Sequence, residues 1–197
     1  MAGGATRLRI MLRVIPEAPP RLTDEGLVAE GGGWFVLNAR EARWHERPGR
    51  RSISFTGRSE WEADTYFPML GVNLAVLEPG EPNSMYHWET ETEAFLVLSG
   101  EALLIVEGQE RPLRQWDFVH CPPGMNHDIL GAGDTRCVVL AVGAREHQDG
   151  PDWGGYPVHE TAIRHGAGVE EETSDENVAY ARFPESVPTR YGDGWLP

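Results

Sequence analysis

The chain has few cysteines, no long apolar run and few positive charges. Its 197 residues include two cysteines, Cys121 and Cys137. Two cysteines do not make a disulfide framework in a chain of this length. We therefore expect two reduced, mostly buried thiols, with a bridge between them as the alternative. No apolar run approaches the roughly 18 to 20 residues that a membrane-spanning helix needs, so we expect no membrane partner.

Positive charge is scarce. The chain has 17 Lys and Arg residues against 31 Asp and Glu residues, which gives a formal net charge of -14 at pH 7. Nucleic acids and anionic membranes repel so acidic a protein, and we predict that neither is a partner. The hydrophobic content of 40% is that of an ordinary globular protein with a packed core.

The amino-terminal stretch lacks the features of a secretion signal. Arg7, Arg9 and Arg13 interrupt the apolar residues of the segment 1–15. A signal peptide needs an unbroken apolar core, so the sequence predicts a cytoplasmic protein. The alternation in this segment fits a short strand or a loose arm.

Helical periodicity is missing, whereas short alternating or apolar runs bounded by Gly and Pro recur along the chain. Such runs predict strands, and their spacing predicts an all-β sandwich or barrel. The charged stretch 40–51 is expected to be irregular, with a turn at Pro48 and Gly49. Ser174 is expected to cap a short helix that runs through Tyr180. We expect strands at residues 34–38, 52–56, 70–77, 93–98, 102–106, 116–121, 127–130 and 137–142.

Acidic residues surround one histidine in the stretch 80–100. His87 and Glu89 are two residues apart, so on an extended chain they point to the same face. A straight strand from His87 to Glu93 would separate those side chains by about 20 Å, which is too far for one ion. If the three residues act together, the chain must fold back between Glu89 and Glu93, and Glu93 must open a second strand. Glu91 falls in that turn and is not expected to be a ligand.

A second histidine follows a rigid turn. Residues 122–124 read Pro-Pro-Gly, and His127 comes next at the start of a predicted strand, where its side chain can point into a barrel. His120 lies out of phase in the preceding strand and is expected to be structural. The remaining histidines are expected at the surface: His45, His147, His159 and His165.

These two stretches resemble the paired motifs of the cupin superfamily. The first family motif is G-x5-H-x-H-x3,4-E-x6-G, and His87, Glu93 and Gly100 follow its spacing. Two departures occur in it. Six residues separate Gly80 from His87 where the pattern has five, and Glu89 stands where the family has a second histidine.

The second family motif is G-x5-P-x-G-x2-H-x3-N. Pro122, Gly124 and His127 match it, while Trp116 replaces its glycine and Gly131 replaces its asparagine. The resemblance covers roughly residues 70–142, under half of the chain, and the two motifs agree with the family in order and internal spacing.

The resemblance implies a fold and a metal site. The fold is the cupin or jelly-roll β-barrel, also called a double-stranded β-helix. The site implied is one divalent transition metal, which can be Fe, Mn, Zn or Ni because ligand type alone does not choose among them. The predicted ligands are His87, Glu93 and His127 together with Glu89. Because Glu89 replaces the usual histidine, it is either the fourth ligand or a catalytic base.

The rest of the chain is expected to build around the barrel. We expect an N-terminal arm at residues 1–67 with strands that join the barrel, a barrel core at 68–145 and a C-terminal extension at 146–197. The strands at 93–98 and 102–106 are apolar on both faces, so the arms or a second subunit must cover their outer sides. Proteins of the cupin family are commonly dimers, and we predict a homodimer. The terminal Trp195 is expected to be docked on the protein.

Two functions remain open from the sequence. The first is a metal-dependent enzyme that acts on a small polar molecule, with oxygenase-type chemistry favoured and isomerase or decarboxylase chemistry as alternatives. The second is a non-catalytic protein that stores or senses a small ligand or a metal. An enzyme should lose turnover in His127→Ala, whereas a binding protein would keep its affinity for the ligand without any turnover.

Overall fold

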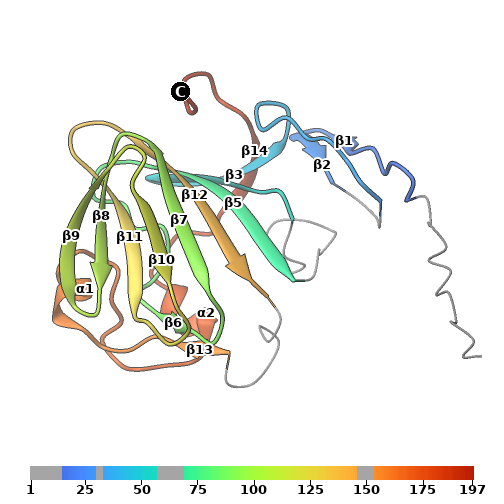
Figure 1. Ribbon diagram of the computed structural model, residues 1–197. Coiled ribbons are helices and arrows are strands. Elements are labelled where there is room, and N and C mark those ends of the chain that lie inside the picture. The colour runs from blue at the N-terminus through green and yellow to red at the C-terminus, as the bar shows by residue number, and fades with distance from the viewer. Residues whose placement is uncertain (1–14, 30–32, 57–68, 146–152) are drawn as a thin grey trace, which may run out of the picture.

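The computed structural model describes residues 15–29, 33–56, 69–145 and 153–197, so the first fourteen residues of the arm predicted at 1–67 lie outside the described residues. The described chain forms fourteen strands and two short helices (Figure 1). No helix in these ranges is long and apolar enough to cross a membrane. The elements are β1 Arg21–Thr23, β2 Gly26–Val28, β3 Arg43–Arg47, β4 Arg50–Ser54, β5 Leu70–Leu77, β6 Trp88–Glu89, β7 Glu93–Ser99, β8 Glu101–Val106, β9 Gln109–Arg114, β10 Phe118–Cys121, β11 His127–Ala132, β12 Cys137–Ala144, β13 Gly154–Gly155, α1 Glu160–Arg164, α2 Glu176–Tyr180 and β14 Val187–Arg190.

Two antiparallel sheets carry the fold. The larger sheet has the strand order β10-β7-β12-β5-β4-β3-β14, and the smaller one has the order β11-β8-β9. Two short pairs, β1 with β2 and β6 with β13, lie outside them. Neighbouring strands in both sheets run antiparallel. This arrangement confirms the predicted all-β, jelly-roll class.

The main core fills the space between the two sheets. Val97 and Val139 from the larger sheet pack in one buried cluster with Ala102 and Ile129 from the smaller one. Cys121 and Cys137 belong to the same cluster, and both are free thiols. The prediction of reduced, buried cysteines is therefore confirmed.

Segments from both ends of the chain cover much of the outer surface. Ala162 of α1 packs with Ile105 on the outer side of β8. Trp44 of β3 lies under the C-terminal tail, where its ring is 5.4 Å from that of Trp195. The expected docking of Trp195 is confirmed. The C-terminal extension also covers the outer face of β8, one of the two apolar faces for which the sequence predicted a cover.

The stretch 40–51 is wrongly predicted as irregular, because it forms a hairpin. Arg43–Arg47 and Arg50–Ser54 pair antiparallel around a two-residue turn of Pro48 and Gly49. Proline and glycine in that order suit the middle of a tight turn, and Gly49 has a φ of 81°. The alternation was hidden from the sequence analysis because charged side chains occupy both faces of these strands.

The structure differs from the sequence prediction in three other elements. The strand expected at 34–38 is an isolated bridge at Trp34, and its backbone pairs with Glu17 only. The polar strand β9 was missed, since its residues are mostly exposed and lack an apolar face. The predicted C-terminal helix exists as α2, but its cap is Asp175 and not Ser174.

Candidate metal centre

The two histidines of the predicted motifs are joined through their backbones. The N–H of His87 donates to the carbonyl of His127 at 3.1 Å, and the N–H of His127 donates to the carbonyl of His87 at 2.8 Å. This reciprocal pair sets the two residues directly opposite each other, so their side chains leave from the same side. The turn that precedes His127 is held as well, because the N–H of Gly124 donates to the carbonyl of Glu89.

The chain folds back after the first histidine, as the sequence requires. β6 ends at Glu89, residues 90–92 bend, and β7 opens at Glu93. This bend brings Glu93 Oε2 to 2.9 Å from His127 Nε2 and to 3.6 Å from His87 Nε2. Three side chains from a span of 40 residues, His87 to His127, therefore converge on one point.

Both imidazole rings are oriented in the same way by the backbone. His87 Nδ1 lies 2.7 Å from the carbonyl oxygen of Met85, and His127 Nδ1 lies 2.9 Å from that of Met125. A carbonyl oxygen only accepts, so each Nδ1 must carry the proton and donate it. This arrangement leaves both Nε2 atoms, which face Glu93, as the ligand positions of neutral rings.

The protein without an ion holds these groups as a charged cluster. Burial opposes protonation of His127, but hydrogen bonds to Cys121 and Glu93 outweigh it and raise the pKa of His127 to about 10. Burial likewise opposes protonation of His87, and hydrogen bonds to Glu89 and Glu93 hold its pKa well above the ordinary value. Burial would raise the pKa of Glu93, yet its hydrogen bonds from the two histidines hold that pKa below the ordinary value. A divalent cation would replace the protons on both Nε2 atoms.

The donor set fits a divalent transition metal. The ligand atoms of His87, Glu93 and His127 all lie within 4.8 Å of one another. Two imidazoles and one carboxylate suit Fe, Mn, Zn or Ni. Glu89 is close to only part of this set. Its Oε1 is 3.3 Å from His87 Nε2, but it does not lie within 4.8 Å of all three ligand atoms. Its role as fourth ligand or base stays a prediction.

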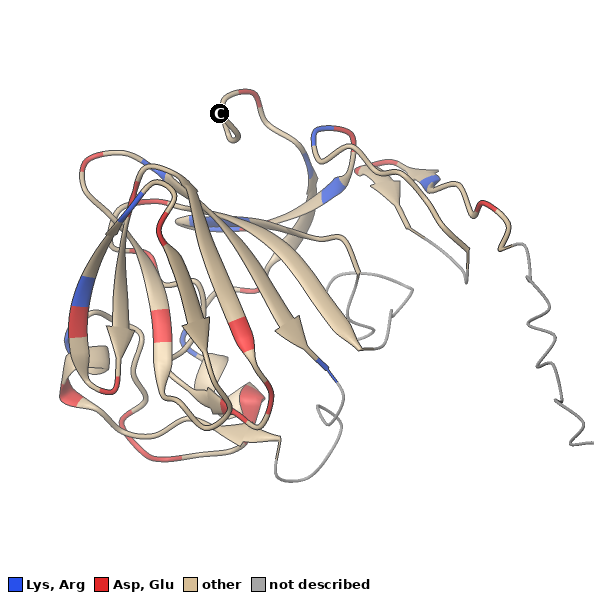
Figure 2. Ribbon diagram, in the orientation of Figure 1, with Lys and Arg blue, Asp and Glu red and all other residues tan. Residues whose placement is uncertain are grey.

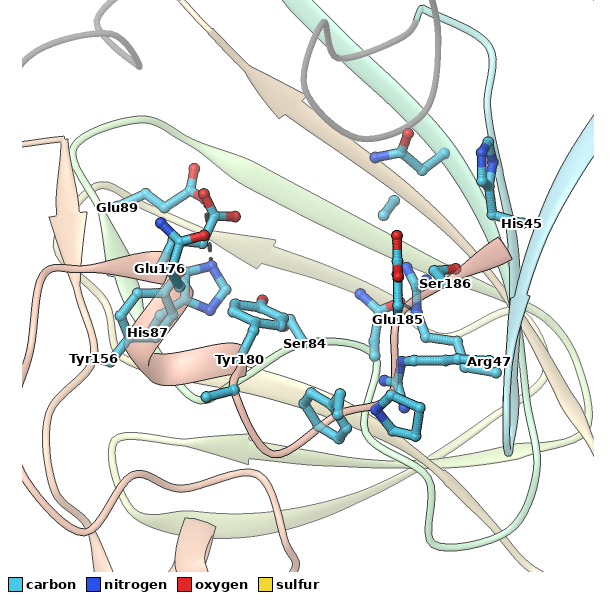
Figure 3. A pocket seen from close by; sticks show the side chains of 18 of the residues that line it. His45, Arg47, Ser84, His87, Glu89, Tyr156, Glu176, Tyr180, Glu185 and Ser186 are labelled. Atoms are coloured by element: carbon cyan, nitrogen blue, oxygen red, sulfur yellow. Dashed lines mark hydrogen bonds and ion pairs between the residues drawn. The ribbon is translucent and has the colours of Figure 1, made fainter. Parts of the chain in front are cut away.

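The cluster opens into a pocket with a volume of about 510 Å³. Figure 3 shows His87, Glu89 and Tyr156 at one side of this pocket and His45 and Arg47 at the other. A pocket of this size suits a small-molecule ligand, for which sites of roughly 300 to 1,000 Å³ are typical. The metal cluster thus lies in the wall of a cavity that a small molecule can enter.

Several lining residues were missed by the sequence analysis. His45 was expected at the surface, but it is 6% exposed and lines the pocket. Arg50 of β4 and Tyr180 of α2 line it as well. Recognising the hairpin of β3 and β4 would have placed His45 and Arg50 on a sheet, and the two turn residues Pro48 and Gly49 were the signal for that hairpin. No local signal points to Tyr180.

The other predicted histidines lie outside the cluster. His120, which was expected to be structural and not a ligand, is exposed on β10 and does not belong to the cluster. His159 caps α1 by accepting a hydrogen bond from the N–H of Thr161, and His165 lies 2.8 Å from the exposed Glu110. His147 lies outside the described residues.

Comparisons with known proteins agree with this architecture. Residues 73–143 match the family model described as the cupin domain. The chain therefore contains a cupin domain, and the cluster of His87, Glu93 and His127 lies within it. No curated protein matches the chain.

Solved structures of other proteins are similar to parts of the chain. A putative sugar phosphate isomerase from Acidithiobacillus ferrooxidans is 35% identical over 39% of this chain and 51% of its own, with a TM-score of 0.38. A cupin-superfamily sugar phosphate isomerase from Silicibacter pomeroyi is 28% identical over 50% of this chain and 61% of its own, with a TM-score of 0.43. A cupin 2 conserved barrel domain protein from Salinispora arenicola is 26% identical over 48% of this chain and 74% of its own, with a TM-score of 0.39. The similar region is thus about half to three fifths of the length of the two isomerase chains.

Proposed function

We propose that this protein is a metal-dependent enzyme that acts on a small polar molecule in the pocket. The observation that supports this function is the shared orientation of His87 and His127. Each ring donates its Nδ1 proton to a backbone carbonyl and presents Nε2 to the same carboxylate of Glu93. Three protein ligands leave coordination positions free for substrate, as in other catalytic metal sites.

Oxygenase-type chemistry is the reaction class that we favour. Two histidines and one carboxylate with open positions form the ligand set of many non-haem iron oxygenases. When bound, the metal would supply Lewis acidity and a template that brings O2 and substrate together. The protein's own part is to hold the ligand atoms on paired strands and to bury them, since His87 and His127 are 6% and 2% exposed.

Glu89 serves as a general base in this proposal. Its Oε1 lies 3.3 Å from His87 Nε2, it lines the pocket, and its side chain is 15% exposed. A carboxylate beside the substrate position can accept a proton from carbon or from a hydroxyl group. The same residue would serve an isomerase or a decarboxylase, so Glu89→Gln should lower kcat more than metal content in each of these reactions.

Metal analysis is the direct test of the site. We expect full-length protein purified without added metal to contain about one equivalent of one transition metal, and His87→Ala and His127→Ala to contain much less. His165→Ala is a matched control, because it removes an imidazole that lies outside the cluster. Substoichiometric metal in the wild type, or equal metal in His87→Ala, would refute the site.

Nitric oxide tests, without knowledge of the substrate, for the open coordination position that an oxygenase needs. Nitric oxide is a stable surrogate for O2 that gives a characteristic paramagnetic resonance signal on ferrous iron with an open position. We expect that signal in the wild type loaded anaerobically with Fe(II), and its absence in His127→Ala. Tight metal binding without any nitric oxide adduct would favour the non-catalytic, metal-binding alternative.

A further inference from the structure

The pocket has two ends of different chemistry. Figure 3 shows His87 on one side of the cavity and His45 and Arg47 on the opposite side. Arg50 belongs to the second side, because it pairs directly with Arg47 across the hairpin turn. Its Nη1 also donates to the hydroxyl of Ser52, the residue that pairs with His45.

Arg47, the first of these two arginines, has partners within the protein. Arg47 forms an ion pair with Glu81, donates to the carbonyl of Pro82 at 3.0 Å, and stacks on the ring of Phe183 at 3.9 Å. Burial and then the positive charge of Arg50 lower the pKa of Arg47. Arg47 is therefore part of the pocket wall, and it adds positive potential beside Arg50.

The second arginine has spare donors and no acid partner. Arg50 Nε donates weakly to Asn83 Oδ1 at 3.4 Å, and Nη1 donates to Ser52 Oγ at 2.7 Å. A guanidinium has five N–H groups, so three remain without a partner in the part of the chain that the structure describes. Glu185 lies on the same side of the pocket but forms no ion pair with Arg50 in that part of the chain.

An unpaired, partly buried cation is unusual in this protein. The chain has 31 acidic residues against 17 basic ones and a net charge of -14, so acidic partners for an arginine are plentiful. Arginines cluster on β3 and β4, whereas acids are spread over many loops and strands (Figure 2). A guanidinium fork that faces a cavity matches the geometry of a carboxylate or a phosphate.

A buried acceptor lies between the two ends of the pocket. Asn73, Ala141 and Phe95 are paired across β5, β12 and β7, and all three line the pocket on one face of the sheet. Asn73 Oδ1 is buried and has no hydrogen-bond partner among the described residues. A buried carbonyl oxygen that lacks a donor costs free energy, and a ligand hydroxyl group would satisfy it.

We propose that Arg50 binds the terminal anion of the substrate, and that the substrate is a small hydroxylated carboxylate or phosphate ester. Its anion contacts the guanidinium, a hydroxyl group donates to Asn73 Oδ1, and its oxygen atoms at the other end reach the metal centre. The last contact rests on the proposed function, whereas the first two do not.

Calorimetric titration of the full-length protein tests the anion site. The probes are glycerol 3-phosphate for a phosphate, malate for a carboxylate and glycerol as the neutral control. We expect at least one of the two anions to bind and glycerol not to bind, and the tighter anion identifies the anionic group. Arg50→Gln should weaken that binding at least tenfold. Arg111→Gln changes the net charge equally on the exposed strand β9 and should stay within twofold of wild type.

Three results would overturn the proposal: no binding of either anion at 10 mM, binding by Arg50→Gln that equals wild type, or an equal loss in Arg111→Gln. Metal content separates this failure from failure of the proposed function. Arg50→Gln should keep its metal, and the tighter of the two anions should still bind to His127→Ala through Arg50.

A measurement on the wild type covers the case in which Arg50→Gln does not fold. Phenylglyoxal modifies accessible arginines, and peptide mass mapping gives the rate at each one. We expect the tighter anion to slow modification of Arg50 several-fold and to leave the rate at Arg111 unchanged. An unchanged rate at Arg50 under saturating anion would overturn the proposal.

Discussion

Asp128 is a buried acid beside the metal centre whose charge is only half satisfied. Its Oδ1 accepts hydrogen bonds from the N–H and the hydroxyl of Ser84 at 3.1 and 2.6 Å. Its Oδ2 is buried and has no partner among the described residues. Burial raises the pKa of Asp128 to about 6, although hydrogen bonds from Ser84 act in the opposite direction.

This raised pKa makes Asp128 a source of instability at neutral pH. A folded-state pKa of about 6 against an unfolded value of 3.8 means that the unfolded chain ionises first. Stability is therefore lost as the pH rises from about 4 to 6, by up to about 3 kcal/mol at 1.36 kcal/mol per pKa unit. Asp128→Asn should remove that loss of stability. The substitution itself should cost about 1 to 2 kcal/mol, because it leaves an amide N–H without an acceptor.

Urea denaturation between pH 4 and 7 measures this effect. We expect Asp128→Asn to gain stability relative to wild type as the pH rises, and to exceed it by about 1 to 2 kcal/mol at pH 7. Asp134→Asn, on an exposed turn, makes the same charge change and should follow wild type. A constant difference across this pH range would show that Asp128 does not ionise as described.

The residues of the candidate metal site could be predicted from the sequence because the signals for them are local. The residues from His87 to Glu93 and from Pro122 to His127 each span one turn. The direction of their side chains depends on that turn and not on distant parts of the chain. Arg50 gives no such signal. Its place in the pocket depends on the pairing of β4 with β5, and long-range pairing is not visible in spacing along the chain.

At the scale of elements, the hairpin of β3 and β4 positions one side of the pocket. Gly49 in its turn has a φ of 81°, and a Cβ placed there would lie 2.5 Å from Glu81 Oε2. Glu81 is the ion-pair partner of Arg47, so the turn, the ion pair and the pocket wall depend on one another. The sequence showed the turn residues but not this contact, because Glu81 is distant in the chain.

Gly49→Ala should therefore cost more than backbone strain alone. A left-handed residue with a side chain costs about 1 to 2 kcal/mol, and Gly49→Ala adds a clash with the Glu81 carboxylate. Gly80→Ala is a matched control, because Gly80 has the same φ of 81° and open space at its Cβ position. Chemical denaturation should show a larger loss for Gly49→Ala by about 1 kcal/mol or more. Equal losses would mean that the carboxylate moves away freely.

At the scale of the whole molecule, the described residues leave one apolar face uncovered. The arms cover the outer sides of β5 and β8, but Trp116 and Phe118 at the edge strand β10 are 67% and 66% exposed. Next to them, Leu96 of β7 and Leu140 of β12 are half-buried on the outer side of the same sheet. Large exposed aromatic residues beside an apolar sheet face indicate an interface between proteins.

We predict that two copies of the chain associate through this face. Sedimentation at micromolar concentration should show a dimer, and the dimer should strengthen with salt because each copy carries a net charge of -14. Phe118→Asp should yield monomers, whereas Val178→Asp, at an exposed apolar residue of α2, should not. A single species of 21.9 kDa at all salt concentrations would contradict the dimer.

Most of the pocket wall comes from a different part of the chain than the candidate metal ligands. Of the 21 lining residues in the part of the chain that the structure describes, thirteen lie outside residues 73–143, and ten of these belong to the extension after residue 152. The candidate metal ligands and most of the pocket wall are therefore encoded in separate stretches of sequence. Under the proposed function, we expect changes in the extension to alter which small molecule the pocket accepts, while the strands that carry the candidate metal ligands stay as they are.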